Sequence, residues 1–540
     1  MQADLALDSA AGRRAALATA AWLRGVLGSR AAGARLTADS RALRRDDVFL
    51  AWPGARSDGR DHIAAALDSG AAAVLWDNAA PFAWPATCDV PNRAVPDLKQ
   101  AAGAIAAAWY GQPAERLRVV GVTGASGKST CAWWTAQALT TLGERCAVAG
   151  TLGIGFIPDG SAAALRDTGK TTPDPVELQA SLAQLVEEGA RALAMEVSSI
   201  GLVEGRVNGM KFDIALFTNL SRDHLDYHGS MAAYEQAKAR LFAWPGLSAA
   251  VVNIDDACGQ RLADLAATRG IRLVRVSAAG TASADLRASA VGYGAGGLAF
   301  TLEGAFGRRQ VATPLIGTYN LENWLCVLGV LLVAGYAPDA AIGALARLVP
   351  APGRLEPVTL AGVRAGAAPL VLVDYAHKPD ALEKVLAACR PLAAARGGRL
   401  VLVFGCGGDR DAGKRPLMGA IAAQGADRVI VTSDNPRSED PRAIIDQIVA
   451  GANAVACEIE PDRRTAIHAA IAGAGAHDVV VIAGKGHETY QEVAGRKLPF
   501  SDPDAARGAL AARAGVAAEV PAGASGPAAA PMMAPGGAPC

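Results

Sequence analysis

A glycine-rich turn followed by Lys-Ser-Thr is the part of this sequence whose chemistry is most specific. The apolar run 116–122 leads into Thr123-Gly124-Ala125-Ser126-Gly127-Lys128-Ser129-Thr130, and a helix is predicted over 131–142. In such a turn, backbone N–H groups and the lysine bind phosphate, and a hydroxyl reaches Mg²⁺. Val122 replaces the first glycine of the full Walker pattern, so the loop is the shorter Gly-x-x-Gly-Lys-Ser. A chance Gly-Lys-Ser turn is the alternative, but the flanking elements favour a nucleoside triphosphate site.

Other polar motifs follow predicted strands. Glu196 ends one strand, and the segment from Asn219 to His224 follows the next. In the last third of the chain, four more motifs stand after strands: Asp374–His377, Gly407–Asp411, Asp434–Arg437 and Gly484–Glu488. Open α/β sheets bind ligands at the carboxyl ends of their strands. The pattern therefore predicts two ligand-binding rims that face each other across a cleft.

Alternating strands and helices predict an α/β fold with mainly parallel sheets and helices on both faces. The expected strands are 47–51, 72–76, 116–122, 192–197, 212–219, 249–253, 370–374, 400–405, 429–432 and 479–483. Helices are expected over 98–110 and after Asp174, where Pro175 and Glu177 would complete an N-terminal capping box. The apolar stretch 325–334 is about half a membrane span and indicates a buried helix.

Composition limits the class of protein. The 540 residues predict three domains, and the 52 basic and 52 acidic side chains give no field that favours nucleic acid or a membrane. The nine cysteines form no Cys-x-x-Cys pair, so neither a disulfide framework nor zinc is indicated and a reducing cytoplasm is expected. Acidic residues near the N-terminus argue against a signal peptide. The Ala/Gly/Pro-rich residues 516–540 predict a disordered tail.

The sequence resembles the Mur ligase family, ATP-dependent amide-bond-forming enzymes of peptidoglycan synthesis. Besides the phosphate loop, the motifs that carry the resemblance are Met195–Ser199, Thr218–Gly229, Gly317–Asn323, Pro352–Glu356 and Asp374–Pro379. The resemblance implies a three-domain architecture with a central P-loop parallel-sheet ATPase domain and a C-terminal Rossmann-like α/β domain. The implied boundaries are 1–112 for UDP-substrate binding, 113–346 for ATP binding, 347–515 for amino-acid binding, and 516–540 for the tail.

The resemblance implies that ATP and Mg²⁺ are cofactors. The implied ATP-binding residues are Gly124, Ala125, Ser126, Gly127, Lys128, Ser129, Thr130, Asn320, Asn323, Arg354, Asp374 and His377. The implied catalytic residues are Lys128, Glu196, His224 and Lys238. Ser129, Glu196, His224 and Lys238 would hold metal, with Lys238 as a carbamate derived from CO₂, because a hard cation prefers anionic oxygen over an amine. Since ATP contacts come from two domains, we expect domain closure on binding.

Within the family, the resemblance is to members that add meso-diaminopimelate to UDP-N-acetylmuramoyl-L-alanyl-D-glutamate through an acyl phosphate. The implied nucleotide-peptide contacts are Ala38, Ser40, Ala55, Arg56, Ser57, Thr171, Thr172, Ser198, Glu204 and Arg206. The implied diaminopimelate contacts are Arg410, Asp434, Asn435, Pro436, Arg437, Gly484 and Glu488. An arginine suits the distal carboxylate of diaminopimelate and a glutamate suits its ammonium. We expect a monomer with small-molecule substrates, no nucleic acid and no membrane insertion.

Three alternatives are weighed against this interpretation. A folylpolyglutamate synthetase and a lysine-adding ligase are related possibilities, and the segments Thr37–Arg41 and Asp434–Arg437 argue against both. A nucleotide-dependent switch is a possibility of another class, but it leaves the motifs of the last domain unexplained. Glu204 stands at a position where many relatives carry glutamine.

Overall fold

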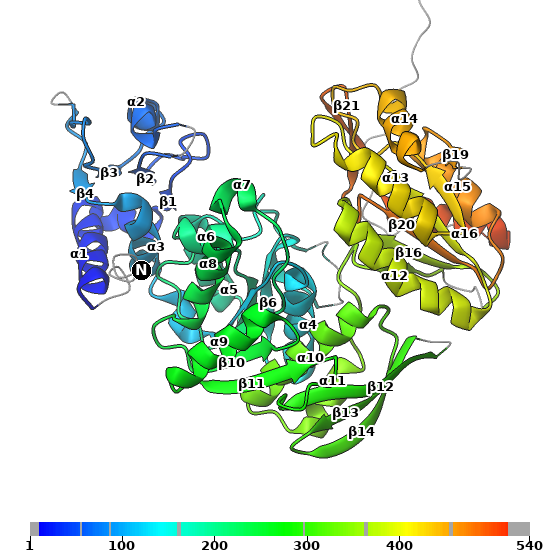
Figure 1. The fold of residues 1–540 in the computed structure, drawn as a ribbon. Helices are drawn as coiled ribbons and strands as arrows, with labels where there is room; N and C mark the ends of the chain where they lie inside the picture. The colour runs from blue at the N-terminus through cyan, green and yellow to red at the C-terminus, as the bar shows by residue number, and fades with distance from the viewer. Residues whose placement is uncertain are drawn as a thin grey trace, which may run out of the picture. The chain divides into compact units, whose positions relative to one another are not determined.

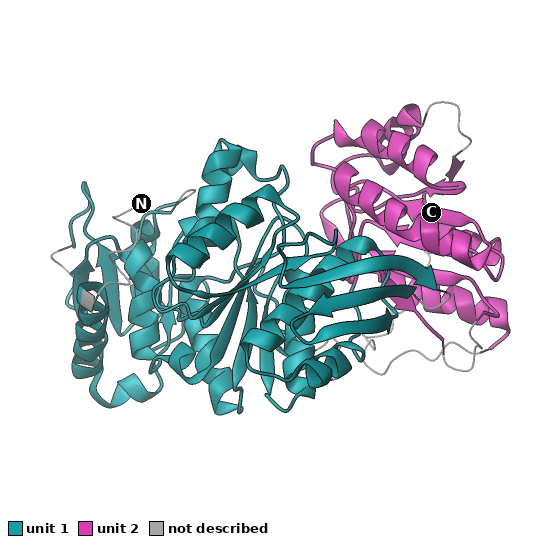
Figure 2. Cartoon of the chain, turned by 60° about the horizontal axis from the view of Figure 1, so that its bottom comes forward, with its two compact units in different colours: residues 1–352 teal, residues 353–540 magenta. Residues whose placement is uncertain are grey.

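The computed structural model describes residues 10–54, 57–85, 88–158, 162, 164–294, 297–360, 366–452 and 457–516. The chain forms two compact units, residues 1–352 (unit 1) and 353–540 (unit 2), shown in different colours in Figure 2. The expected domain boundaries at 112/113, 346/347 and 515/516 stay predictions. The tail predicted to be disordered lies, beyond Val516, outside the described residues.

Unit 1 begins with a four-stranded parallel sheet in the order β1-β2-β3-β4. Its elements are α1 (Ala10–Leu27), β1 (Leu36–Thr37), β2 (Val48–Ala51), α2 (Ile63–Asp68), β3 (Ala73–Asp77), β4 (Asn92–Val95) and α3 (Leu98–Trp109). Alternate residues of β2 face opposite sides of the sheet. Val48 and Leu50 pack in the cluster of α1 and α3, whereas Phe49 and Ala51 pack with α2. Both faces of this small sheet are therefore buried.

A ten-stranded sheet follows, in the order β14-β13-β12-β11-β10-β9-β5-β8-β6-β7 (Figure 1). Its strands are β5 (Arg118–Thr123), β6 (Cys146–Gly150), β7 (Gly153–Phe156), β8 (Ala192–Glu196), β9 (Ile214–Phe217), β10 (Ala249–Asn253), β11 (Arg272–Ser277), β12 (Leu286–Gly294), β13 (Gly297–Gly304) and β14 (Gly307–Thr313). The strands from β11 to β6 run parallel, and β7, β13 and β14 pair antiparallel with their neighbours. The predicted mainly parallel sheet is confirmed.

Helices cover both faces of this sheet. They are α4 (Lys128–Thr141), α5 (Pro175–Glu187), α6 (Ser199–Val203), α7 (Leu225–His228), α8 (Met231–Phe242), α9 (Ala257–Thr268), α10 (Thr318–Val333) and α11 (Pro338–Leu345). In β9, Ile214 and Leu216 join the core with α4, α10 and α11, and Ala215 and Phe217 join the core with α5, α8 and α9. A strand buried on both faces explains why the sequence there is an unbroken apolar run.

Two local predictions in unit 1 need correction. Helix α4 begins at Lys128, three residues earlier than expected, because Gly127 adopts a left-handed conformation and the chain enters the helix directly after it. Asp174 caps α5 by accepting from Val176 N, as predicted. Glu177 does not serve the capping box; its carboxylate pairs with Arg166 at 2.6 Å. The buried helix predicted over 325–334 is the second half of α10.

Unit 2 is built on a six-stranded sheet in the order β15-β16-β20-β17-β18-β19, in which β15 alone pairs antiparallel. Its elements are β15 (Glu356–Val358), β16 (Leu370–Asp374), α12 (Pro379–Arg396), β17 (Leu400–Phe404), α13 (Lys414–Gly425), β18 (Arg428–Val431), α14 (Pro441–Gly451), β19 (Glu458–Ile459), α15 (Arg463–Ala472), β20 (Val479–Ala483) and α16 (Asp502–Ala514). A separate hairpin, β21 (Tyr490–Val493) and β22 (Arg496–Pro499), connects β20 to α16.

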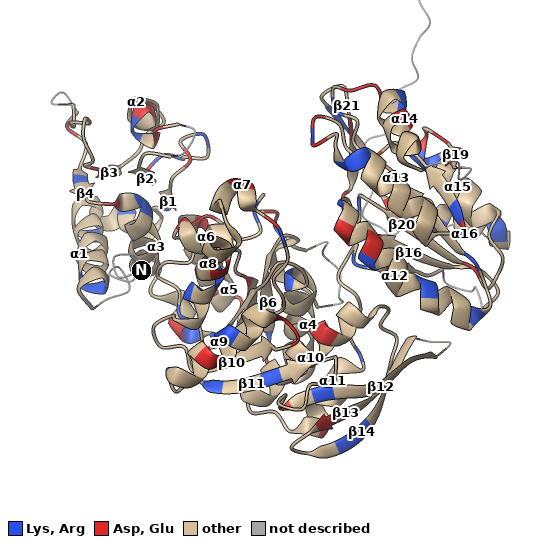
Figure 3. Cartoon of the chain, in the orientation of Figure 1, with Lys and Arg blue, Asp and Glu red and all other residues tan. Residues whose placement is uncertain are grey.

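The charged side chains are distributed over both units, with Lys and Arg interspersed among Asp and Glu (Figure 3). This distribution accords with the balanced composition. Within the described parts of the chain, no helix has the length and apolar character needed to cross a membrane.

Unit 2 contains a fully buried ion pair that offers a test of its packing. Arg463 Nε and Nη2 each donate to the Asp502 carboxylate at 2.7 Å, and both side chains have 0% exposure. We expect Asp502→Ala to destabilise unit 2 by about 3–5 kcal/mol, because a buried cation loses its counter-charge. Hydrogen exchange of the α15 and α16 amides measures this change.

The matched control is Asp446→Ala. Asp446 pairs with Arg442 on the exposed face of α14, so its loss is expected to change stability by less than about 1 kcal/mol. Equal exchange rates in the two variants would contradict the assigned importance of the buried pair.

Candidate active site

The phosphate loop predicted from the sequence connects β5 to α4. Gly124 and Gly127 have φ angles of 150° and 82°, and glycine adopts such positive values most readily. The loop is held by the segment that follows β9. Ala125 N donates to Asn219 O at 2.7 Å, and Ser126 N donates to Asn219 Oδ1 at 3.0 Å. The backbone of the loop is thus fixed by neighbouring residues of the same sheet edge.

Both glycines of the loop also lie against other side chains. A Cβ added to Gly124 would lie 1.9 Å from Thr218 Oγ1, and one added to Gly127 would lie 2.4 Å from Asn323 Oδ1. Asn323 Nδ2 donates to Asn320 Oδ1 at 3.2 Å, and both asparagines are buried on α10. The structure therefore brings Asn323, predicted to contact ATP, to the phosphate loop.

Two lysines converge on the carbonyl of Gly124. Lys128 Nζ donates to Gly124 O at 3.0 Å and to Ala125 O at 2.9 Å. Lys238, on α8, donates to Gly124 O at 2.7 Å; it is 1% exposed, and its Nζ lies 4.4 Å from the centre of the Tyr234 ring. Burial, together with the charge of Lys128, lowers the pKa of Lys238 well below its usual value. The neutral amine is thus favoured at Lys238.

Glu196 lies beside the loop because β8 pairs with β5, with Glu196 opposite Val122. Its carboxylate is 2% exposed and accepts from Thr151 N at 2.7 Å. Thr172 Oγ1 donates to the backbone carbonyl of Glu196 at 3.0 Å and lies 3.1 Å from Ser198 Oγ. Thr151 Oγ1 donates to Thr171 Oγ1 at 3.2 Å. Four residues predicted for the metal or the peptide substrate therefore surround one strand end: Thr171, Thr172, Glu196 and Ser198.

His224 is less closely tied to the other predicted metal ligands. It has a φ of 53°, its side chain is 43% exposed, and its Nε2 lies 3.6 Å from Asp223 Oδ2. The His224 and Tyr234 rings are 6.1 Å apart, so Tyr234 lies near both His224 and Lys238. No group of three or more His, Cys, Asp or Glu in the described residues is arranged to hold a metal ion.

Glu204 has protein partners in this structure. Its carboxylate lies 2.5 Å from Lys99 Nζ on α3 and accepts from the Tyr227 hydroxyl at 2.5 Å. Partial burial opposes ionisation, but the hydrogen bonds from Lys99 and Tyr227 hold the pKa of Glu204 below its usual value. Arg206 Nη1 donates to Thr172 O at 3.3 Å, so Arg206 joins the group around Glu196. The substrate roles of Glu204 and Arg206 stay predictions.

The predicted uridine contacts lie near the first two strands of unit 1. Ala38 and Ser40 follow β1, beside the Asp39–Arg41 ion pair at 2.8 Å. Ser57 O accepts from Gly54 N at 2.9 Å. Ala55 and Arg56 lie outside the described residues.

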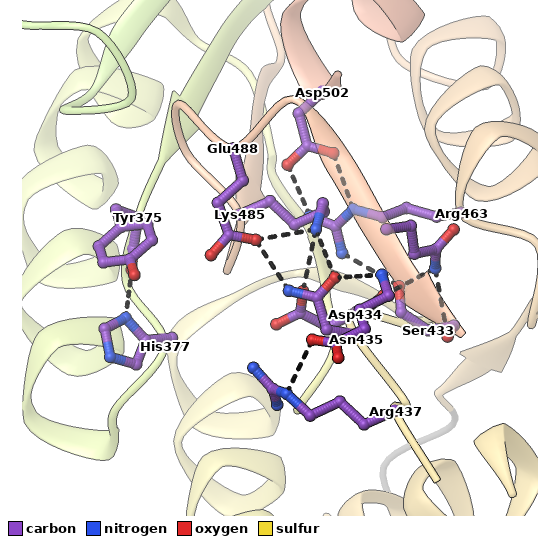
Figure 4. A network of polar contacts seen from close by, with 12 residues as sticks. Tyr375, His377, Ser433, Asp434, Asn435, Arg437, Arg463, Lys485, Glu488 and Asp502 are labelled. Carbon is purple, nitrogen blue, oxygen red and sulfur yellow. Dashed lines mark hydrogen bonds and ion pairs between the residues drawn. The ribbon is translucent and has the colours of Figure 1, made fainter. Parts of the chain in front are cut away.

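Unit 2 has a pocket of about 460 Å³ at the carboxyl ends of its strands. Most of the residues predicted for diaminopimelate line it: Arg410, Asp434, Asn435, Arg437, Gly484 and Glu488. Figure 4 shows that several of these belong to one polar network. Cations and carboxylates are both present, as a zwitterionic ligand requires.

Lys485 is the centre of this network, although no role was predicted for it. It is 0% exposed, donates to Asn435 Oδ1 at 2.9 Å and to Glu488 Oε2 at 3.0 Å, and lies 3.6 Å from Asp434 Oδ1 (Figure 4). Burial raises the pKa of Asp434, although Arg463 and Lys485 oppose this shift. The position of Lys485 between two glycines after β20 was a signal that could have identified it.

The predicted residues Arg354, Asp374 and His377 gather around Tyr375. Asp374 accepts from Leu355 N and Ala376 N, both at 2.8 Å, and burial raises its pKa. The Arg354 guanidinium lies 5.2 Å from the centre of the Tyr375 ring. His377 Nδ1 donates to Tyr375 O at 2.8 Å, and burial lowers the pKa of His377. Burial thus opposes protonation of the His377 ring, and its role in ATP binding stays a prediction.

A phosphate loop on a parallel sheet and a separate pocket for a charged ligand define a nucleotide-binding α/β protein with a second substrate site. Family models match residues 34–110 (Mur ligase family, catalytic domain), 122–331 (Mur ligase middle domain) and 353–486 (Mur ligase, glutamate ligase domain). The chain belongs to the Mur ligase family.

Several relatives carry the name UDP-N-acetylmuramoyl-L-alanyl-D-glutamate–2,6-diaminopimelate ligase, among them the following two. The protein from Ralstonia nicotianae is 53% identical over 91% of this chain and 95% of its own length, and the one from Pseudomonas aeruginosa is 50% identical over 88% and 95%. A solved structure of a ligase of that name is 36% identical, with a TM-score of 0.65 over 89% of this chain and 95% of its own. The α/β fold and the family resemblance inferred from the sequence are confirmed.

The close approach at Gly124 predicts the effect of a single methyl group. We expect Gly124→Ala to weaken ATP binding by at least about tenfold, because the new Cβ and Thr218 Oγ1 cannot both keep their positions. Isothermal titration with a non-hydrolysable ATP analogue measures the affinity. In the control, Gly343→Ala on α11, nothing lies within 4 Å of the added Cβ, so binding should not change. Full affinity in Gly124→Ala would argue against this loop as the phosphate site.

Proposed function

We propose that this chain is an ATP-dependent ligase that adds meso-diaminopimelate to UDP-N-acetylmuramoyl-L-alanyl-D-glutamate in peptidoglycan precursor synthesis. The observation that carries the proposal is the pocket in unit 2, where the Arg437 guanidinium and the Asp434 and Glu488 carboxylates line one cavity. In the same chain, unit 1 supplies a phosphate loop. High identity to relatives named for this reaction, over nearly their whole length, supports the same activity.

The proposed reaction has two steps. The γ-carboxylate of the D-glutamate attacks the γ-phosphoryl group of ATP, and an acyl phosphate and ADP form. The free amine of diaminopimelate then attacks the acyl carbon, and inorganic phosphate leaves as the amide bond forms. Both steps bring negative charges together, so cationic groups at the loop lower the barrier. We assign this role to Lys128, which lies at the start of α4, and to the backbone N–H groups there.

Mg²⁺, when bound, would neutralise charge on the transferring phosphoryl group. We propose that Ser129, Glu196, His224 and Lys238 hold it, and the hydroxyl and carboxylate oxygens among them suit a hard cation. An unmodified Lys238 amine does not suit the metal, whereas a carbamate on it would supply anionic oxygens. Lys238 is buried, and among the described residues its amine contacts the Gly124 carbonyl oxygen and the Tyr234 ring. Because neither partner carries a negative charge, these surroundings favour the neutral amine, which is the form that reacts with CO₂.

The nucleotide-peptide substrate is assigned to unit 1. We propose that Thr171, Thr172, Ser198 and Arg206 bind its peptide part, since they surround the strand end that carries Glu196. The uridine part is assigned to the segments after β1 and β2. A cytoplasmic location and a monomeric state complete the proposal.

The distal end of diaminopimelate is assigned to the unit 2 pocket. A guanidinium binds a carboxylate through parallel N–H donors, and buried carboxylates bind the ammonium. Lysine has no distal carboxylate and would leave the ligand-facing N–H groups of Arg437 without an acceptor. Rejection by an unpaired buried group is worth orders of magnitude in specificity.

An acceptor panel tests the proposed function. We expect phosphate release to require ATP, UDP-N-acetylmuramoyl-dipeptide and meso-diaminopimelate together, with lysine a much poorer acceptor. Arg437→Ala should lower kcat/KM for diaminopimelate by roughly 10²-fold or more and leave ATP affinity unchanged. Arg442→Ala, which removes an exposed arginine of α14, is the control. If Arg437→Ala lowered ATP affinity as much as kcat/KM for diaminopimelate, the assignment of the acceptor pocket would be wrong. ATP hydrolysis stimulated by a protein partner would favour a nucleotide-dependent switch.

The lysine carbamate has its own test. We expect one carbamate ¹³C resonance after incubation of the wild type with ¹³C-bicarbonate, and its loss in Lys238→Arg. Lys384→Arg, at an exposed position of α12, should retain the resonance. A resonance that persists in Lys238→Arg would contradict modification at this residue.

A further inference from the structure

Arg437 is held in an unusual backbone conformation. Its φ of 52° lies in the left-handed region, which costs free energy for a residue with a Cβ and therefore needs support from its surroundings. The support comes from the β21–β22 hairpin. Arg437 N donates to Glu492 O at 3.0 Å, and Arg437 O accepts from Ala494 N at 2.7 Å. The direction in which the Arg437 side chain leaves the backbone thus depends on the hairpin.

The same hairpin also holds the guanidinium group. Arg437 Nε lies 3.2 Å from Glu492 Oε2, and Arg437 Nη1 donates to Gly408 O at 2.7 Å. Across the described residues, no hydrogen bond from Nη2 of Arg437 to another protein group is found. The Nε edge is therefore used inside the protein, and the Nη2 end remains for the carboxylate of a ligand.

The hairpin is connected to the other pocket residues as well. Glu492 N donates to Asn435 Oδ1 at 2.9 Å, and Gln491 Nε2 donates to Asp434 O at 2.7 Å. Its turn, Ala494-Gly495, has φ angles of 48° and 73°, the pattern of a tight hairpin turn that fixes the register of the two strands. β21 and β22 form a two-stranded sheet of their own, and an isolated parallel bridge between Arg437 and Val493 joins the hairpin to the 434–437 segment.

We propose that Glu492 is a positioning residue that orients the Arg437 guanidinium and so sets the selectivity for an acceptor amino acid with a distal carboxylate. The inference rests on the proposed function. A paired, oriented guanidinium loses less conformational entropy when it binds a carboxylate than a mobile one does. Glu492 also balances one positive charge, so the pocket favours a zwitterion over a simple anion.

The test compares acceptors in the full-length enzyme. We expect Glu492→Ala to raise KM for meso-diaminopimelate about tenfold, which is the effect of losing one charge-assisted contact. The kcat and the KM for ATP should stay within about twofold of the wild-type values. The diaminopimelate-to-lysine ratio of kcat/KM should fall by the same factor, because lysine does not use the guanidinium. The matched control is Glu458→Ala, which removes the partner of Arg428 at a similar ion pair outside the residues that line the pocket.

A second, more conservative variant distinguishes the loss of the contact from misfolding. Glu492→Gln keeps the shape and an acceptor oxygen, so a smaller fall in the acceptor ratio, about threefold, is expected. An unchanged ratio in both variants, or equal losses with diaminopimelate and lysine, would overturn the inference. Failure of the proposed function is distinguishable, because the wild type itself would then release no phosphate in response to diaminopimelate.

Discussion

The edge at which parallel strands end is the constraint on which both candidate sites depend. In unit 1, β5 lies between β8 and β9, and its register places Val122 opposite Glu196 and Thr123 opposite Phe217. The phosphate loop, the carboxylate and the Asn219 segment must therefore emerge side by side. In unit 2, Asp374 and Phe404 both pair with Ala483, so three loops open at one edge. Parallel pairing brings together residues that are far apart in sequence.

Two buried lysines at these sheet edges, Lys485 and Lys238, differ in how their positive charge is compensated. Lys485 lies beside the carboxylates of Glu488 and Asp434, so its charge is compensated. The Lys238 amine contacts a backbone carbonyl oxygen and an aromatic ring, and no ion pair of this lysine occurs among the described residues. A buried charge without a counter-ion is unfavourable. The difference accords with the proposal that Lys238, unlike Lys485, is chemically modified.

The apolar runs predicted the central parallel strands, such as β5, β9 and β20, because a strand buried on both faces has a clear pattern, but the parallel strands β6 and β11 were missed. The motifs after the predicted strands supplied the candidate site residues, whose roles stay predictions. The antiparallel strands β12–β14 and the β21–β22 hairpin were not predicted. Their residues are exposed on one or both faces, so the pattern is weak. The role of Arg463 was missed because its partner, Asp502, is distant in sequence. Lys485 has Glu488 three residues away, but its other partners, Asp434 and Asn435, are about fifty residues away. Only the fold brings these charges together.

Selectivity in such a site depends on orientation more than on which residues are present. Arg437 follows directly from the Asp434–Arg437 motif, yet its direction is set by Glu492 and Ala494, which lie on a hairpin with no sequence signal for function. A sequence motif can identify a guanidinium, whereas its conformation requires contacts with residues more than fifty positions away. A substitution in the hairpin could therefore alter acceptor choice while every residue of the motif is retained, since the donor atoms would remain and only their direction would change.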